Sequence, residues 1–166
     1  MKSISLNSVF SEIIFPATQE PNWKSEVDRW YQLDAPAYAL TQFYAENREK
    51  LGPPPSFIFL ASPTASNETD VAFAKSGEQK WSPGKFVHTL PNVRCSPLCQ
   101  VMKWTGPMLC IQNGIDTETT ALHEAGWMLS EEYPVIWVLS VLTDSLSVRA
   151  HVLKLYSEKN LERISS

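Results

Sequence analysis

The chain alternates short apolar runs with longer segments in which apolar residues recur at helical spacing. The runs at 56–62, 107–112 and 134–142 are almost wholly apolar, which is typical of strands buried on both faces of a sheet. The segment 148–158 alternates between apolar and polar residues, and this predicts a half-buried strand. Residues 3–15 are rich in β-branched and apolar residues, and they predict a strand or a hairpin.

Segments with helical spacing lie between these predicted strands. They predict helices at 22–33, 35–51, 93–105 and 116–132, and a short helix near 67–70. Gly52 and the prolines that follow it form the stop signal of the helix at 35–51. Strands that alternate with helices predict an α/β layered fold with a mixed, mostly parallel sheet.

Length, charge and cysteine content narrow the class of protein. A chain of 166 residues suits one domain that spans 1–166. The formal net charge is −4 and no Lys/Arg cluster occurs, which argues against nucleic acid or an anionic membrane as a partner. No apolar run is long enough to span a membrane, and the first ten residues are too polar for the core of a signal peptide. Three cysteines without a framework spacing favour the reducing cytoplasm.

The segment TGPMLCIQNGIDTETTALHEAG, residues 105–126, has the layout of a nucleophile elbow. An apolar strand leads to a tight glycine turn and then to a helix. Ile115 occupies the position at which a nucleophile is expected. The elbow therefore has the backbone pattern of a catalytic site without a reactive side chain.

The helix after the elbow has two distinct faces. One face is an apolar stripe made of Ala121, Leu122, Ala125, Met128 and Leu129. The opposite face carries Thr119, Thr120, His123 and Trp127. Asp116 is a candidate N-cap, and both Asp116 and Glu118 lie in the first turn, where the helix dipole favours negative charge.

These residues resemble the nucleophile region of β-ketoacyl synthases, which have a thiolase-like fold. Gly-Pro at 106–107 and Ala-Leu-His at 121–123 match the family pattern at the right spacing, and Leu-Pro-Asn at 90–92 resembles the segment before the elbow. The resemblance covers roughly residues 35–157 and is strongest to half-length ketosynthase-like proteins of bacterial fatty-acid, polyketide and aryl-polyene gene clusters. It implies half of a thiolase-like fold, with residues 1–166 as one N-terminal-half domain.

This sequence departs from the family pattern at the residues that the condensation reaction requires. The nucleophilic Cys of the family falls on Ile115, and a hydrocarbon side chain cannot attack a thioester. The family's remaining catalytic residues come from a C-terminal half that this sequence does not contain. Asp116 and Glu118 replace small neutral residues, and their carboxylates would raise the pKa of a thiol placed at the elbow. The resemblance therefore implies a non-catalytic ketosynthase-like subunit, comparable to a chain-length factor.

An enzyme of another kind is the alternative. Cys110 with His88 or His123 would make a small thiol-dependent acyl transferase or thioesterase. The simpler interpretations are a packed thiol on an apolar strand and two structural histidines. Cys95 and Cys99 have helical spacing but no further ligands at zinc spacing, so we expect no metal and no cofactor.

The resemblance also implies a partner. In a complete ketosynthase the corresponding helix is buried on both sides, so the face with Thr119, Thr120, His123 and Trp127 is predicted to be an interface. The expected occupant is a second copy of this chain or a catalytic ketosynthase subunit, and an acyl carrier protein is a further candidate. The competing hypothesis is that residues 1–34 cover this face within the same chain. Aromatic residues of that segment, Trp23, Trp30 and Tyr31, are predicted to be core.

Overall fold

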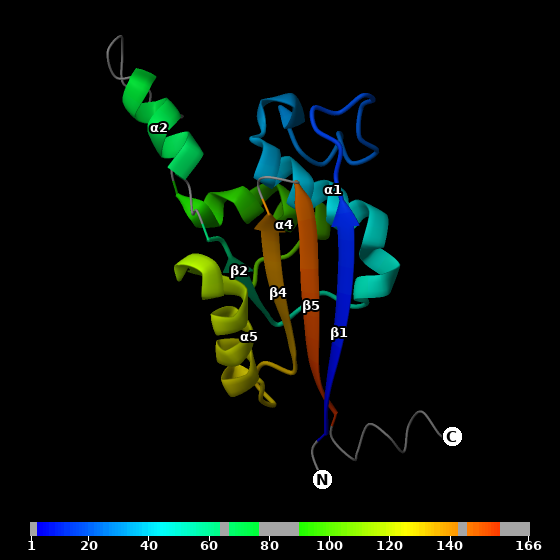
Figure 1. The fold of residues 1–166 in the computed structure, drawn as a ribbon. Coiled ribbons are helices and arrows are strands. Elements are labelled where there is room, and N and C mark those ends of the chain that lie inside the picture. The colour runs from blue at the N-terminus through cyan, green and yellow to red at the C-terminus, as the bar shows by residue number, and fades with distance from the viewer. Residues whose placement is uncertain (1–2, 64–66, 77–89, 143–145, 157–166) are drawn as a thin grey trace.

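The computed structural model describes residues 3–63, 67–76, 90–142 and 146–156. These ranges contain one five-stranded sheet in the order β1-β5-β4-β2-β3 (Figure 1). The strands are β1 (Ser3–Glu12), β2 (Phe57–Ala61), β3 (Met108–Ile111), β4 (Val135–Leu142) and β5 (Ser147–Tyr156). β2 is parallel to both β3 and β4, whereas β5 is antiparallel to β4 and to β1. Four strands therefore share one direction and β5 opposes them, which confirms the predicted mixed sheet.

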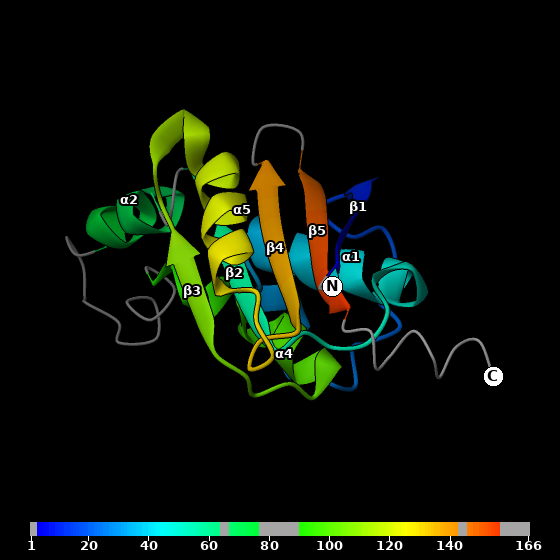
Figure 2. The same cartoon turned by 90° about the horizontal axis from the view of Figure 1, so that it is seen from below.

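Helices lie on both faces of the sheet. The α-helices are α1 (Ala35–Leu51), α2 (Asn67–Ser76), α4 (Ser96–Met102) and α5 (Thr117–Met128), and the 3-10 helices are η1 (Trp30–Gln32), η2 (Pro91–Cys95) and η3 (Gly114–Asp116). α5 packs on one face, and α1 and α4 lie on the other (Figure 2). This confirms the predicted α/β layers. Within the described ranges, no helix has both the length and the apolar character needed to cross a bilayer.

Local signals set the limits of α1. The Asp34 carboxylate accepts a hydrogen bond from the Ala37 backbone N–H at 2.8 Å, so it satisfies one of the free donors at the helix start. Gly52 ends the helix with φ 77°, a conformation that glycine adopts without steric cost. Asp34 also pairs with the buried Arg94 side chain at 3.3 Å, and this contact ties η2 to the beginning of α1.

The sheet separates two apolar cores. Ile58 and Leu60 of β2 point to the α1 side, where they join Trp137, Phe43 and the residues of α4. Their neighbours Phe57 and Phe59 point to the α5 side and pack with Ala121, Ala125 and Leu153. Alternate residues of one strand thus serve opposite cores. This two-sided burial is the reason why residues 56–62 read as a continuous apolar run.

The predicted helix at 22–33 is wrong. Most of this segment forms turns, and only Trp30–Gln32 is helical, as a single 3-10 turn. Arg29, at φ 57°, has a left-handed backbone that interrupts any continuous α-helix. Trp23 is buried as predicted, but Tyr31 is 68% exposed, so its prediction as a core residue is also wrong.

β3 is the second correction. It lies at the edge of the sheet instead of in its centre, and Leu109 is 50% exposed. The turn before it is held by Trp104, whose indole N–H donates to the Pro55 carbonyl at 2.7 Å. The Trp104 ring lies against Gly106, where an added Cβ would come within 2.5 Å of the indole. A glycine is therefore required before Pro107 by the packing of Trp104.

Candidate functional site

The elbow between β3 and α5 is a short 3-10 turn with its own hydrogen bonds. Gly114 has φ 55°. The Thr117 hydroxyl accepts from the Asn113 N–H at 2.9 Å and donates to the Gly114 carbonyl at 2.6 Å. Asp116 stands at the N-cap position, but its side chain makes no capping hydrogen bond, so Thr117 has the stabilising role that we predicted for Asp116.

Ile115 lies at the tip of this elbow and is fully exposed, at 101%. It borders a cavity of roughly 230 Å³ that is also lined by Ala61, Pro63, Glu118, Ser140, Leu142 and Arg149. This cavity lies at the carboxyl ends of β2 and β4, the place where ligands bind in open α/β sheets. A larger groove of roughly 450 Å³ lies along α1, and none of the predicted site residues lines it.

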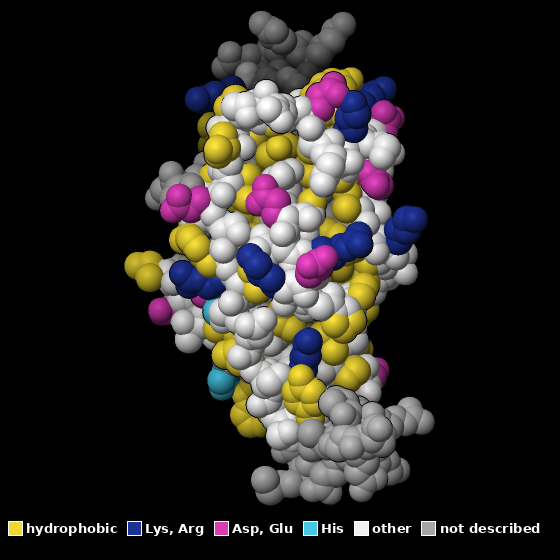
Figure 3. Space-filling model, turned by 90° about the vertical axis from the view of Figure 1, so that its right-hand side faces the viewer, with side chains coloured by type: hydrophobic (Ala, Val, Ile, Leu, Met, Phe, Trp, Pro, Cys, Tyr) yellow, Lys and Arg dark blue, Asp and Glu magenta, His cyan; other side chains and the backbone are white. Residues whose placement is uncertain are grey.

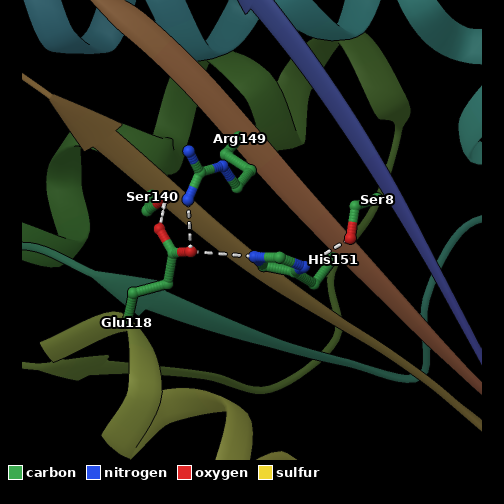
Figure 4. A network of polar contacts seen from close by, with 5 residues as sticks. All are labelled: Ser8, Glu118, Ser140, Arg149 and His151. Carbon is green, nitrogen blue, oxygen red and sulfur yellow. Dashed lines mark hydrogen bonds and ion pairs between the residues drawn. The ribbon is translucent and has the colours of Figure 1, made fainter. Parts of the chain in front are cut away.

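Glu118 is the centre of a polar network beside this cavity (Figure 4). The Ser140 hydroxyl donates to Glu118 Oε2 at 2.6 Å. Glu118 Oε1 accepts from Arg149 at 2.8 Å and lies 2.9 Å from His151 Nε2. The other ring nitrogen of the same histidine, Nδ1, lies 2.7 Å from the Ser8 hydroxyl. Four elements, α5, β4, β5 and β1, thus contribute to one connected chain of polar contacts.

The network keeps the Glu118 carboxyl ionised. Burial by itself raises its pKa, but hydrogen bonds from Ser140, His151 and Arg149, together with the Arg149 charge, lower the pKa to about 2. An ionised carboxylate only accepts hydrogen bonds, so His151 must carry a proton on Nε2. In the neutral imidazole, Nδ1 is then an acceptor, and the Ser8 hydroxyl donates a hydrogen bond to it.

The cysteines lie on the α1 side of the sheet. Cys110 packs, half-buried, against the core of that side, whereas His123 is exposed on α5 beyond the opposite face. The structure therefore does not bring Cys110 and His123 together, and His88 lies outside the described residues. Burial raises the pKa of Cys110, Cys99 and Cys95. In the described part of the chain, no group of three or more His, Cys, Asp or Glu side chains is placed to hold a metal ion.

The outer face of α5 is open. Thr119 and His123 are exposed, Thr120 is half-buried and hydrogen-bonded to Asn113 at 2.9 Å, and Trp127 is 75% exposed. The Trp127 indole donates to His123 Nε2 at 3.1 Å. The N-terminal segment does not cover this face, because β1 pairs with β5 at the far edge of the sheet and Trp23 packs on Tyr38 of α1. The hypothesis of cover by residues 1–34 is therefore wrong.

The polar network was not predicted, although one sequence signal points to part of it. The alternation in 148–158 places Arg149 and His151 on the same face of β5. The contribution of Ser8 depends on the register of β1 against β5, where it is directly opposite His151. The pattern of a single strand does not contain that information.

Comparisons with known proteins identify the fold. No protein-family model matches the sequence. No curated protein matches it either. Among solved structures, the chain is similar to one from the complex of a ketosynthase, ApeO, with its chain length factor, ApeC, from Xenorhabdus doucetiae, with a TM-score of 0.65 and 15% sequence identity. The match covers 82% of this chain and 62% of the other chain.

This chain has a ketosynthase-like fold. The similarity agrees with the mixed sheet and with the layers on both of its faces, and it confirms the thiolase-like fold class expected from the sequence. The chain spans less than two thirds of the length of the structure that it matches. At 15% identity the similarity is one of fold.

Proposed function

We propose that this chain is a non-catalytic ketosynthase-like subunit that pairs with a catalytic ketosynthase in the synthesis of a fatty acid, a polyketide or an aryl polyene. The observation that carries the proposal is Ile115, a fully exposed hydrocarbon side chain at the tip of the elbow. The resemblance of this strand, turn and helix to the nucleophile region of β-ketoacyl synthases implies a nucleophile at this position, and an isoleucine there cannot be acylated. We infer further that residues 1–166 correspond to the N-terminal half of such a fold.

The surroundings of the elbow support a role without condensation chemistry. Glu118 is bound by Ser140, Arg149 and His151, and these contacts hold its carboxylate ionised and in one place. Its charge lies in the first turn of α5, where it opposes the formation of a thiolate. Neither the wild-type chain nor the Ile115→Cys variant is therefore expected to condense an acyl thioester with a malonyl thioester. Product formation by either protein alone would contradict this interpretation of the elbow.

The outer face of α5 is the proposed contact with the partner. Trp127 is 75% exposed, and its hydrogen bond to His123 holds the indole in one orientation. A large aromatic side chain held on an otherwise polar surface is a typical anchor of protein interfaces. The similar structure comes from a complex of a ketosynthase with its chain length factor, and this favours a catalytic ketosynthase over a second copy of the chain. An acyl carrier protein is a further candidate for the same surface.

The test is a binding measurement with a catalytic ketosynthase encoded beside this chain in its native host. Sedimentation velocity at micromolar concentration should show a complex with wild type, and Trp127→Ala should weaken it by about tenfold or more, as for an interface anchor. Tyr31→Ala is the matched control, since Tyr31 is also an exposed aromatic residue, at 68%, but lies in η1 away from α5. A wild-type chain that stays monomeric and does not bind the ketosynthase would overturn the proposal.

A further inference from the structure

Ser8, His151 and Glu118 lie in a row across β1, β5 and the start of α5 (Figure 4). We propose that Ser8 is a nucleophile, with His151 as its base and Glu118 as the positioning residue of that base, and that the site hydrolyses esters or thioesters of apolar acyl chains. The proposal does not depend on the proposed function, in which non-catalytic refers to condensation at the elbow. Ser8 and His151 have no part in the elbow, and only Glu118, in the first turn of α5, lies beside both sites.

The hydrogen bonds from Ser8 to His151 and from His151 to Glu118 run in the direction that activates a hydroxyl. Glu118 accepts a hydrogen bond from His151 Nε2–H, so the neutral imidazole has a lone pair on Nδ1 that is directed at the Ser8 hydroxyl, 2.7 Å away. A hydroxyl, an imidazole and an ionised carboxylate in this order are the three components of a Ser–His–acid site, which is recognised by geometry and not by sequence position. Arg149 and Ser140 hold the carboxylate in place, so the imidazole orientation is fixed before any substrate binds.

Ser8 is accessible and has a donor beside it. It is exposed on β1, which is an edge strand, while His151 below it is 9% exposed. Ile13 and Leu146 are opposite each other in the register of β1 and β5, and the Ile13 N–H donates to the Leu146 carbonyl at 3.0 Å, so they form a hydrogen-bonded pair. Hydrogen-bonded and non-hydrogen-bonded pairs alternate along an antiparallel ladder, and Ser8 is an odd number of residues from Ile13. Ser8 and His151 are consequently a non-bonded pair, and the Ser8 N–H points to the free edge of the sheet. This N–H is the donor available to a developing oxyanion.

Apolar side chains flank Ser8 on the same face of the strand. Val9 points to the α1 core, so its neighbours on either side, Ser8 and Phe10, point to the opposite face with Ile4 and Leu6. Ile4, Leu6 and Phe10 are 61%, 59% and 52% exposed. Figure 3, which views the molecule from the side of β1, shows exposed hydrophobic side chains among charges of both signs. An apolar acyl chain along this strip would place its carbonyl carbon at the Ser8 hydroxyl.

The reaction balances with water as the only co-reactant. The Ser8 oxygen bonds to the carbonyl carbon while its proton moves to His151 Nδ1. The bond from that carbon to the alcohol or thiol then breaks, and the leaving group takes the proton from His151. Water next attacks the acyl-serine and gives a proton to His151, and the bond to Ser8 breaks as its oxygen regains that proton. The products are a carboxylic acid and an alcohol or thiol.

The test combines covalent labelling with hydrolysis, using the full chain. A fluorophosphonate reagent should label wild type at Ser8, as located by peptide mass spectrometry, and p-nitrophenyl esters of four to ten carbons should be hydrolysed. Ser8→Ala should abolish labelling, and His151→Gln should slow both reactions by about 100-fold or more, the contribution expected of a general base. Glu118→Gln should alter the pH profile of hydrolysis, since it removes the group that fixes the His151 tautomer.

Ser5→Ala is the matched control, because Ser5 lies on the same strand but on the opposite face, toward α1. It should be labelled and active like wild type. Circular dichroism checks that each variant is folded. The proposal is overturned if folded wild type is neither labelled nor more active than Ser8→Ala, or if Ser8→Ala retains the label. Neither outcome bears on the proposed binding to a catalytic ketosynthase, because that proposal is tested separately by sedimentation and by Trp127→Ala.

Discussion

The two faces of the sheet are covered to different extents. On the α1 side, α1 and α4 cover strands from β1 to β2, and the side chains there are almost all apolar and buried. On the other side α5 packs mainly on β2 and β4 and also contacts β5, where Leu153 is buried, so it is β1 that lies open beside it (Figure 1). The open side has the polar network, the elbow and most of the exposed apolar residues of β1. The α1 side therefore contains the larger apolar core, and the other side holds, beside its smaller core, the residues that are free to contact something else.

The largest effect should come from the covered face. Phe43 is 1% exposed at the centre of the α1-side core. Phe43→Ala should lower the free energy of unfolding by about 3–5 kcal/mol, because it removes buried surface and leaves a cavity. Urea unfolding followed by tryptophan fluorescence measures the loss. A change below about 1 kcal/mol would mean that this face is not the main source of stability.

Thiol reactivity should separate the two faces by at least about 100-fold in rate. The native cysteines lie on the α1 side, where burial raises the pKa of Cys99 to about 11 and also raises that of Cys95 and Cys110. A cysteine introduced by Ile115→Cys would be fully exposed at the elbow, so burial would not raise its pKa, and the nearby carboxylates of Asp116 and Glu118 should raise it less than burial raises those of the native thiols. Iodoacetamide at pH 8, with mass spectrometry of each peptide, gives the rates. Fast modification of Cys110 in the native protein would instead support the alternative hypothesis of a thiol-dependent acyl transferase or thioesterase.

The polar network should give a smaller, pH-dependent effect. The pKa of Glu118 is about 2 in the folded chain, below its ordinary value of 4.5, so its stabilising effect is complete above pH 4.5 and is lost as the pH falls toward 2. Glu118→Gln should cost about 1–2 kcal/mol at pH 7, since partial exposure of Arg149 screens the pair. This difference from wild type should shrink below pH 4.5 in urea titrations.

Glu124→Gln is the control for this series, because Glu124 is exposed on the same helix. It should match wild type at pH 7 within about 0.5 kcal/mol. A Glu118→Gln penalty that stays constant from pH 7 to pH 3 would show that packing, and not charge, accounts for the effect.

The smallest effect is expected on the outer face of α5. Trp127→Ala should change the free energy of unfolding of the isolated chain by no more than about 0.5 kcal/mol, because the side chain is 75% exposed. Differential scanning calorimetry of the monomer measures this. A loss above about 2 kcal/mol would mean that Trp127 contributes to the fold of the chain itself, and its proposed role as an interface anchor would lose its basis.

Local signals made most of the fold predictable. The helix at 35–51 was predicted to the residue, since Gly52 and the prolines after it stop it locally. The segment 22–33 has helical spacing too, but the left-handed backbone at Arg29 interrupts the helix. No residue type in that segment predicts a left-handed conformation. Edge or central position is likewise a property of the whole sheet, so β3 was predicted to be buried although it is an edge strand.

The candidate site also has a part that local sequence predicts and a part that depends on the whole fold. Ile115 at the elbow and the open face of α5 follow from a contiguous stretch of sequence, and the structure places both as exposed. The network around Glu118 joins residues up to 143 positions apart, between Ser8 and His151. Its existence depends on strand register and on the placement of α5 over β4. Such long-range pairing has no signature in the spacing of nearby residues.

The contact between Trp104 and Gly106 limits which substitutions the chain tolerates at these two positions. An added Cβ at position 106 would come within 2.5 Å of the indole, whose N–H is held by the Pro55 carbonyl. The two positions are thus constrained together: a chain of this fold with a larger residue at 106 is expected to have a smaller one at 104. The glycine of the Gly-Pro pair by which the sequence resembles a ketosynthase thus has a steric reason for its retention that does not depend on any chemistry at the elbow.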